Sequence, residues 1–248
     1  MRAITLLTDF GTADYFVGAM KGAILSVNSQ AVIVDITHEI PAQDVAAGAF
    51  TLLAAHDSFP EGTIHVAVVD PGVGSARRGV VVTAGNHLFV GPDNGIFTFI
   101  YDRNPSFEAF HITEENYFRY PVSTTFHGRD VFAPVAAALS TGVVPASFGA
   151  AILDPIRLTI STEPEIIHID RFGNVVTNIT RDQFKNSTQL IVNGTLISAF
   201  RDFYGENVGE LDEPFAIWGS AGFLEIAVNG RSAAKLLDVK RGDQVMLT

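Results

Sequence analysis

Aspartates follow two of the buried strands that the first half of the sequence predicts, at the point where each strand ends. Asp9 comes shortly after the apolar run Ile4–Leu7, and Asp70 directly follows the run Ile64–Val69. Because ligands of open α/β sheets collect at the carboxyl ends of the strands, we expect both carboxylates at one rim. A glycine stands two residues after each aspartate, and glycine lets a ligand approach the backbone closely. Either aspartate alone could simply cap a turn, but the pair indicates a binding site.

A third polar segment, residues 123–130, holds His127 in a loop that opens a predicted helix. A histidine in such a place is a candidate general base, although a lone histidine is more often structural. The seven histidines form neither an H-E-x-x-H motif nor a close pair, and the chain has no cysteine. We therefore expect no metal site, no disulfide and no cysteine nucleophile. The glycines after Asp70 fit neither the dinucleotide fingerprint nor the P-loop.

The elements that must position these residues alternate between strands and helices up to about Pro155. Apolar positions at helical spacing predict helices, and short apolar runs predict buried strands. This order indicates an α/β N-terminal domain with a largely buried sheet flanked by helices. The predicted strands are 4–7, 32–36, 64–69, 80–83 and 87–90, the last two as a hairpin, and the predicted helices are 14–27, 43–56 and 129–140.

After Pro155 the alanine-rich helices stop and short strands follow one another. Asn193-Gly194 between two of them is a hairpin signature. We expect a smaller all-β, barrel-like domain at 165–248, an α/β domain at 1–157, and a linker at 158–164. The predicted strands of the second domain are 166–169, 175–178, 189–192, 195–197, 215–218, 223–228 and 244–247.

Composition limits the classes of partner. The hydrophobic fraction of 47% supplies a packed core, and the net charge of −11 repels phosphates, which argues against nucleic acid. The same charge is compatible with a cationic small molecule. No segment has the length of a membrane span, and Asp9 interrupts the first apolar stretch too early for a signal peptide. We therefore expect a cytoplasmic protein that does not enter membranes.

Four segments in order resemble the S-adenosyl-L-methionine (SAM) hydroxide adenosyltransferase family, whose relatives are the bacterial fluorinase and chlorinase. Each segment alone is only weakly specific for this family, but the occurrence of all four in the same order across two domains is specific. They are Thr8-Asp9-Phe10-Gly11-Thr12, Asp70-Pro71-Gly72-Val73-Gly74 with Arg77, Phe126-His127-Gly128-Arg129-Asp130, and Asp170 with Phe172-Gly173-Asn174. The resemblance implies hydrolysis of SAM to adenosine and methionine without a cofactor. It also implies a homotrimer whose sites lie between the N-terminal domain of one subunit and the C-terminal domain of a neighbour.

The same resemblance assigns roles to single residues. Asp70, Arg77 and His127 match a trio that places and activates water. Residues that match substrate contacts are Asp9 for the ribose hydroxyls, Asp170 for the methionine amine, Asn174 for the adenine, Ser220 for the methionine part, Tyr204 as an aromatic contact, and Glu225 and Val228 in the stretch that flanks the pocket.

Two rival functions remain open at this point. A halogenase of the same superfamily would use chloride or fluoride in place of water, but its members carry tyrosine where this chain has Asp70, and a fixed carboxylate repels a halide. A non-catalytic adenosine or SAM sensor would have the same substrate-binding residues but would lack the residues that place and activate water. The presence of Asp70, Arg77 and His127 together favours the hydrolase.

Overall fold

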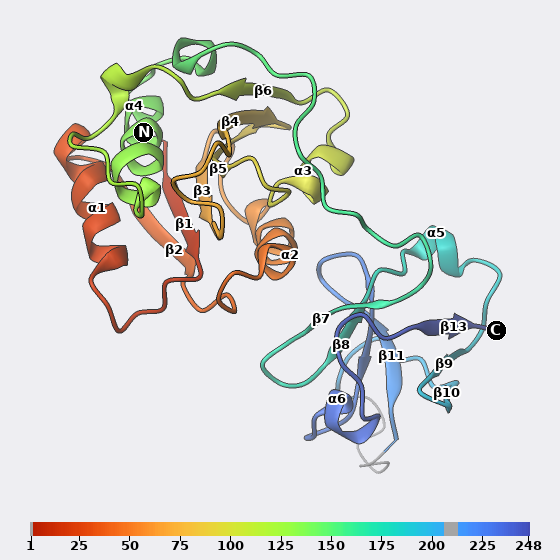
Figure 1. Ribbon diagram of the computed structural model, residues 1–248. Helices are drawn as coiled ribbons and strands as arrows, with labels where there is room; N and C mark the ends of the chain where they lie inside the picture. Colours follow the sequence, from red (N-terminus) through yellow and green to blue (C-terminus); the bar gives the residue numbers. More distant parts are fainter. Residues whose placement is uncertain (1, 206–212) are drawn as a thin grey trace. The chain divides into compact units, whose positions relative to one another are not determined.

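The chain folds into two units, residues 1–158 and 159–248 (Figure 1). The computed structural model describes residues 2–205 and 213–248. The first unit is built on one mixed sheet and the second on antiparallel sheets, as the change of pattern along the sequence predicts.

The sheet of the first unit has six strands in the order β2-β1-β3-β5-β4-β6. Its strands β2, β1, β3 and β5 run parallel, whereas β4 is antiparallel to both β5 and β6. The β4–β5 hairpin expected from the sequence is confirmed. The strands are β1 (Ile4–Thr8), β2 (Ile33–Thr37), β3 (Ile64–Val68), β4 (Gly79–Ala84), β5 (His87–Pro92) and β6 (Glu108–His111).

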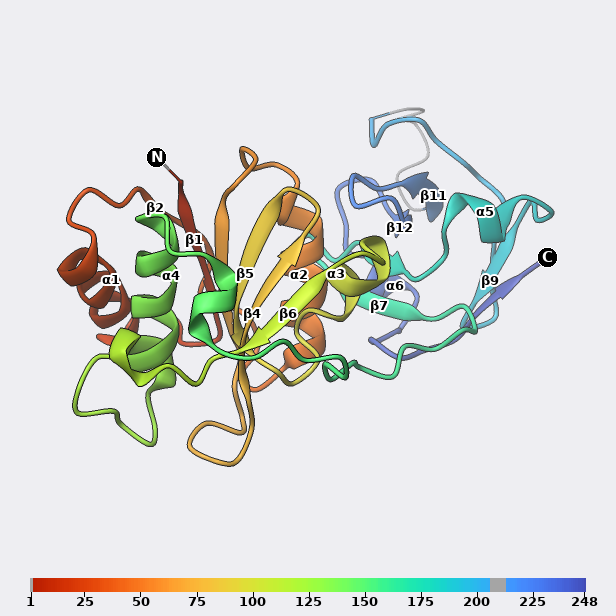
Figure 2. The ribbon, with the colours of Figure 1, turned by 90° about the horizontal axis from the view of Figure 1, so that it is seen from above.

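Helices cover both faces of this sheet. In Figure 2, α1 (Phe16–Val27) and α4 (Ala133–Ser140) lie on one side, with α2 (Val45–His56) and α3 (Thr98–Arg103) on the other. Successive strand residues point to opposite faces, so Leu6 joins the core under α1 and α4 while Leu7 joins the core that includes residues of α2. Both faces are therefore buried, and β1 and β3 are buried at every position without alternation.

The predicted helix 129–140 differs from the observed one. It begins as a π-helical turn, η2 (Gly128–Phe132), and only then continues as α4. The sequence pattern also missed α3 and β6, and the short 3-10 turns η1 (Glu115–Tyr117) and η3 (Pro145–Phe148). These are short segments, and their apolar residues are too few to set a period.

The second unit contains a four-stranded sheet, β11-β12-β8-β7, and a three-stranded sheet, β10-β9-β13, both antiparallel. An isolated bridge between Glu165 and Gln244 links the two sheets beside β7 and β13. Asn193 and Gly194 join β9 to β10 with positive φ angles of 45° and 76°, as a tight hairpin requires. The elements are β7 (Ile166–Ile169), β8 (Val175–Thr177), α5 (Arg181–Phe184), β9 (Leu190–Val192), β10 (Thr195–Ile197), β11 (Phe215–Trp218), β12 (Leu224–Ala227), α6 (Ala233–Leu236) and β13 (Val245–Leu247).

Among the described residues, every helix is too short or too polar to cross a bilayer.

Candidate active site

Asp9 and Asp70 leave the sheet of the first unit from neighbouring strands. β1 and β3 run parallel and Thr8 pairs with Val68, so the loops that follow the two strands emerge at the same edge. This edge is the rim at which the sequence places both carboxylates.

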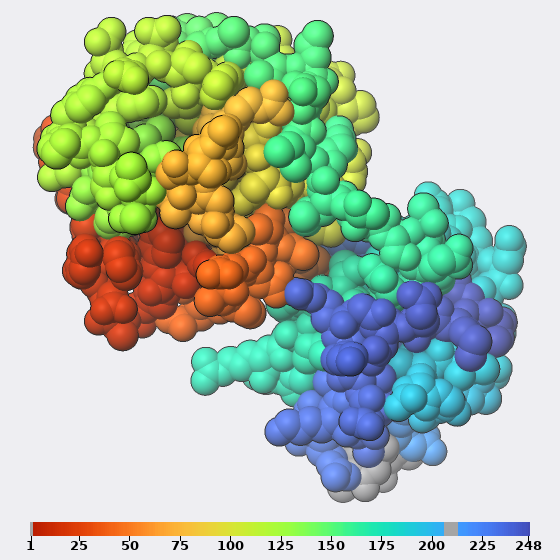
Figure 3. All heavy atoms as spheres, viewed as in Figure 1, coloured from red at the N-terminus to blue at the C-terminus, as the bar shows by residue number. Residues whose placement is uncertain are grey.

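Arg77 joins Asp70 to His127. Its Nε donates to Asp70 Oδ1 at 3.1 Å and its Nη2 donates to Asp70 Oδ2, while the same Nη2 lies 3.1 Å from Nδ1 of His127. The Arg77 and Asp70 side chains are only 9% and 5% exposed. In Figure 3 the orange segment that contains residues 70–77 lies against the yellow-green one that contains His127. The structure therefore brings the predicted trio into one partly buried cluster.

Burial, together with the charges within this cluster, shifts the pKa values of two of its members. Burial raises the pKa of the Asp70 carboxyl above its ordinary value, although Arg77 and the Gly72 amide act in the opposite direction. Burial and the Arg77 cation lower the pKa of His127, and Asp70 and Asp130 oppose that effect only in part. His127 is therefore neutral at neutral pH, and the basicity of Asp70 exceeds that of an exposed carboxylate.

The two loops that carry the trio pack backbone against backbone at Gly74. This glycine has a φ of +77°, and a β-carbon placed on it would lie 2.1 Å from the carbonyl oxygen of Thr124. Only glycine permits both the conformation and the contact. Gly74 thus sets the separation between the loop of Asp70 and Arg77 and the loop of His127.

Asp130 anchors the histidine loop. It is fully buried, and its carboxylate accepts hydrogen bonds from Arg119, from Arg129 and from the backbone N–H of Ser123. These bonds tie both ends of the segment that carries His127 to one carboxylate. The sequence motif contains Asp130, but the sequence alone does not reveal this anchoring role.

Asp9 lies in the loop beside this cluster. Its Oδ2 accepts the backbone N–H of Gln43 at 2.8 Å. The next residue, Phe10, packs edge-on against Phe126 with ring centroids 5.8 Å apart. The Asp9 loop therefore contacts the loop that holds His127.

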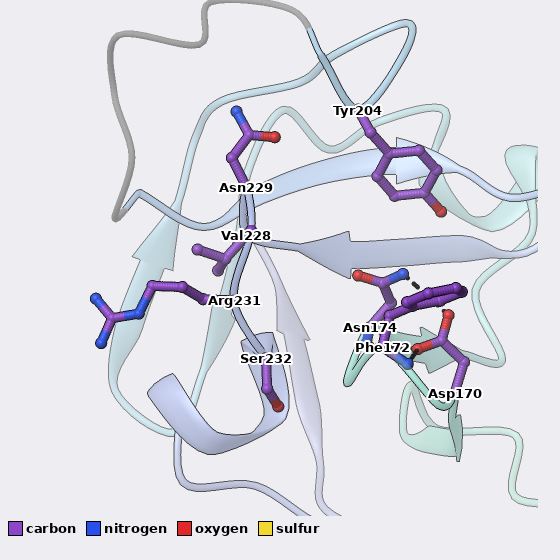
Figure 4. A pocket seen from close by; sticks show the side chains of 9 residues that line it. Asp170, Phe172, Asn174, Tyr204, Val228, Asn229, Arg231 and Ser232 are labelled. Carbon is purple, nitrogen blue, oxygen red and sulfur yellow. Dashed lines mark hydrogen bonds between the residues drawn. The ribbon is translucent and has the colours of Figure 1, made fainter.

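A separate pocket of about 530 Å³ opens in the second unit (Figure 4). Asp170 organises one side of it by accepting the backbone N–H groups of Phe172 and Asn174 on Oδ1 and the Asn174 side-chain amide on Oδ2. In Figure 4, Tyr204 lies above this group and the segment 228–232 lies opposite. The lining residues are Asp170, Phe172, Asn174, Tyr204, Val228, Asn229, Gly230, Arg231 and Ser232.

Tyr204 and Glu225 form a pair at this pocket. The Tyr204 hydroxyl donates to Glu225 Oε2 at 2.9 Å. Burial, and then the nearby Asp170 charge, raise the pKa of Glu225, while the Tyr204 hydrogen bond lowers it. Two neighbouring carboxylates make this end of the pocket suited to a cationic group such as an ammonium.

The structure thus places the sequence-predicted residues in two groups. Asp9, Asp70, Arg77 and His127 belong to the first unit, and Asp170, Asn174, Tyr204 and Val228 line the pocket of the second. Glu225 contacts this pocket through Tyr204, whereas Ser220 lies in the exposed turn between β11 and β12 and is not among the lining residues. The pocket also includes Asn229, Gly230, Arg231 and Ser232, which the sequence analysis missed; the Asn-Gly turn signal directly after the strand was the available clue.

Within the two described ranges, no cluster of three or more histidine or carboxylate side chains has the geometry to hold a metal ion.

Comparison with known proteins gives a consistent match over nearly the whole chain. The model of the SAM hydroxide adenosyltransferase N-terminal domain matches residues 4–149, and that of the C-terminal domain matches residues 164–246. A Methanocaldococcus jannaschii protein named (R)-S-adenosyl-L-methionine hydrolase is 38% identical, covering 98% of this chain and 94% of its own. A Thermus thermophilus protein of the same name is also 38% identical, and the match covers 100% of this chain and 100% of that protein.

More distant relatives and solved structures extend the match. A fluorinase of Actinoplanes sp. is 26% identical over 99% of this chain and 97% of its own. The crystal structure of an uncharacterized conserved protein from Thermotoga maritima matches with a TM-score of 0.92 and 34% identity, covering 99% of this chain and 100% of that one. The crystal structure of a conserved hypothetical protein from Thermus thermophilus matches with a TM-score of 0.83 and 36% identity over the full length of both chains.

Proposed function

Because the chain belongs to the SAM hydroxide adenosyltransferase family, we propose that it hydrolyses S-adenosyl-L-methionine to adenosine and L-methionine. The observation that carries the proposal is the 38% identity, over essentially the full length, with proteins named (R)-S-adenosyl-L-methionine hydrolase. The fluorinase relatives are more distant, at 25–26% identity.

The reaction requires activation of the nucleophile more than of the leaving group. The sulfonium of SAM departs as a neutral thioether, so the sulfur needs no proton. Free water is a poor nucleophile with a pKa of about 15.7, and a positioned group must hold it and take a proton as it attacks C5′. We assign this task to Asp70, Arg77 and His127, whose contacts make one cluster. Placement in line with the C5′–S bond then supplies much of the rate.

The substrate contacts follow the family resemblance and fit the chemistry of each residue. Asp9 binds the ribose hydroxyls, because a carboxylate accepts two hydrogen bonds from a diol. Asp170, with Glu225 close by, binds the methionine ammonium, and Asn174 binds the adenine through its amide. Tyr204 supplies an aromatic contact from the pocket wall, the backbone at Val228 flanks the pocket, and Ser220 supplies a hydroxyl to the methionine part.

Product analysis tests the proposal against its rivals. We expect adenosine and methionine in equal amounts, unchanged by EDTA, because neither a cofactor nor a metal takes part. In high chloride, adenosine should still dominate, since the Asp70 carboxylate repels an anion. A predominance of 5′-chloro-5′-deoxyadenosine would establish a halogenase, and tight binding of intact SAM without any product would establish a sensor.

We further propose a cytoplasmic homotrimer in which each active site combines the first unit of one subunit with the second unit of a neighbour. Light scattering should give three times the subunit mass of 26.6 kDa. Two inactive variants, Asp70→Asn and Asn174→Ala, should regain activity when they are mixed and their subunits exchange. Some sites then combine the unaltered first unit of an Asn174→Ala subunit with the unaltered second unit of an Asp70→Asn subunit. An active monomer, or a mixture that stays inactive after exchange, would refute the shared site.

A further inference from the structure

His38 contacts the loop that carries Asp9 at two points. Its ring Nδ1 lies 2.9 Å from the hydroxyl of Thr8, the residue before Asp9, and its backbone oxygen accepts the N–H of Gly11 at 2.7 Å. The His38 side chain is only 4% exposed, and Thr8 is fully buried. One buried residue therefore holds the chain directly before Asp9 and again two residues after it.

The pairing of β1 with β2 places His38 beside this loop. The two strands pair in register up to Leu6, but the register then slips by one residue, so that Leu7 pairs with Thr37. The next residues along the two strands, Thr8 and His38, come within hydrogen-bonding distance. Irregularities of this kind re-aim a side chain and are over-represented beside functional sites.

Asp35 determines which nitrogen of His38 donates. His38 Nε2 lies 3.2 Å from Asp35 Oδ1, and Lys21 Nζ donates to Oδ2 of the same carboxylate at 2.6 Å. Burial acts to raise the pKa of Asp35, but Lys21 and His38 outweigh it and hold that pKa below its ordinary value. The ionised carboxylate can only accept, so in the neutral ring the hydrogen is on Nε2, and Nδ1 accepts the Thr8 hydroxyl.

The Thr8 hydroxyl connects this histidine to the backbone of the Asp9 loop. Its oxygen accepts the N–H of Phe10 at 3.2 Å, while its hydrogen is directed to His38. From the other side, the N–H of Gln43 donates to Asp9 Oδ2. The backbone on both sides of Asp9 and one of its carboxylate oxygens are therefore fixed, which gives the other oxygen a defined direction.

We propose that His38, acting through Thr8, is a positioning residue that directs the Asp9 carboxylate towards the ribose diol of the substrate. This inference rests on the proposed function, in which Asp9 binds the ribose hydroxyls, and it adds the residue that aims this carboxylate. A carboxylate that is already oriented does not have to be ordered when the ligand binds, so the affinity for the diol is higher. His38 achieves this without touching the substrate.

Two ligands that differ only in the diol test this role. Adenosine, a product of the proposed reaction, carries both ribose hydroxyls, and 2′,3′-dideoxyadenosine lacks them. We expect the wild-type enzyme to bind adenosine about 10–100-fold more tightly, the usual effect of a hydrogen bond to a charged group. Calorimetric titration measures both dissociation constants and needs no turnover.

Thr8→Val removes the link to His38 and leaves a side chain of nearly the same shape. We expect the preference for adenosine to fall below about fivefold, and KM for SAM to rise with little change in kcat. Thr5→Val is the matched control, because Thr5 is also a fully buried residue of β1 whose hydroxyl lies 2.8 Å from a histidine Nδ1, that of His65. It should lower stability to a similar extent and keep the wild-type preference.

Variants at position 38 test the histidine itself. His38→Asn keeps a side-chain oxygen that can accept the Thr8 hydroxyl and should retain most of the preference for adenosine. His38→Leu has no acceptor and should lose this preference. Thermal unfolding identifies a variant that fails to fold, and in that case Thr8→Val decides the matter.

The outcomes separate this inference from the function on which it rests. A preference for adenosine that survives in Thr8→Val, or that falls equally in Thr5→Val, would overturn the positioning role and leave the proposed hydrolysis intact. If the wild-type enzyme binds both ligands equally, the assignment of Asp9 to the ribose is wrong, and the role of His38 falls with it.

Discussion

At the scale of single residues, Asp9 combines a structural contact with its proposed role in binding. Its Oδ2 accepts the N–H of Gln43, a residue with a φ of +65°. A hydrogen bond to this carboxylate therefore supports the turn, and Oδ1 remains for the ribose. Because such a contact with the ribose exists in both the ground state and the transition state, its removal should affect binding more than turnover.

We expect Asp9→Ala to raise KM for SAM by about 10–100-fold, the usual cost of losing a hydrogen bond to a charged group, with a much smaller change in kcat. Steady-state kinetics measures both values. Asp9→Asn keeps a side-chain oxygen that can accept the Gln43 N–H but removes the negative charge. Comparing it with Asp9→Ala therefore separates the effect of losing the turn from the effect of losing the charge. Asp14→Asn removes a charge from the same exposed loop and serves as the control; an equal rise in KM there would point to a general charge effect.

At the scale of elements, the two loops that carry the proposed catalytic trio are positioned by a glycine as well as by charged side chains. Gly74 brings the loop after β3 against the carbonyl of Thr124, three residues before His127. The Arg77–His127 contact joins the same two loops. A side chain at position 74 must push them apart, because a β-carbon cannot lie 2.1 Å from an oxygen.

Gly74→Ala should therefore lower kcat by about 10²-fold, as a displacement near 1 Å can do, and destabilise the first unit. Gly194→Ala is the matched control, since Gly194 has nearly the same φ, +76°, and a β-carbon placed on it would meet nothing within 4 Å. It should bear the same backbone strain and keep wild-type kcat. Thermal unfolding and kinetics on both variants decide the matter, and equal losses of kcat would show that strain alone is responsible.

At the scale of the whole molecule, three histidines packed together away from the trio make stability depend on pH. His65 is fully buried, stacks on Phe89 and contacts His87, whose ring also lies near His56. Burial, then the neighbouring histidines, lower the pKa of His65 to about 3, and burial also lowers the pKa of His87. Asp57 and Glu61 act on His87 in the opposite direction.

The folded state thus binds fewer protons than the unfolded state below the ordinary histidine pKa of about 6.5, so stability is complete above that pH and falls as the pH is lowered. We expect the free energy of unfolding to drop by up to about 1.4 kcal/mol per pH unit between pH 6.5 and 5 on account of His65, whose pKa is lowered to about 3. Urea unfolding at several pH values measures this slope.

Two variants separate titration from packing. His65→Phe removes the titrating group and should flatten the slope. Thr5→Val removes only the hydrogen bond between the Thr5 hydroxyl and His65 Nδ1, 2.8 Å in the structure, and should lower stability while the slope stays steep. A slope that is unchanged in His65→Phe would mean that other groups control the acid sensitivity.

Strands β1 to β5, helices α1 and α2, and the shared edge at which β1 and β3 end follow from the sequence alone. Apolar runs fix strands β1 and β3 because a strand buried on both faces needs continuous apolar residues, and parallel neighbours bring Asp9 and Asp70 to one edge. The Asn193-Gly194 hairpin is equally local, since the turn itself demands residues that accept positive φ. Four short motifs in order were enough to identify the family.

How the site residues meet depends on the packed structure. The Arg77–His127 contact spans 50 positions, and the bonds of Asp130 to Arg119 and Ser123 depend on a π-helical turn that no hydrophobic period predicts. The pocket of the second unit likewise draws on segments near Asp170, Tyr204 and Val228. Sequence patterns record which face of an element is buried, whereas the partners of a histidine and of a carboxylate depend on distances between atoms that only packing sets.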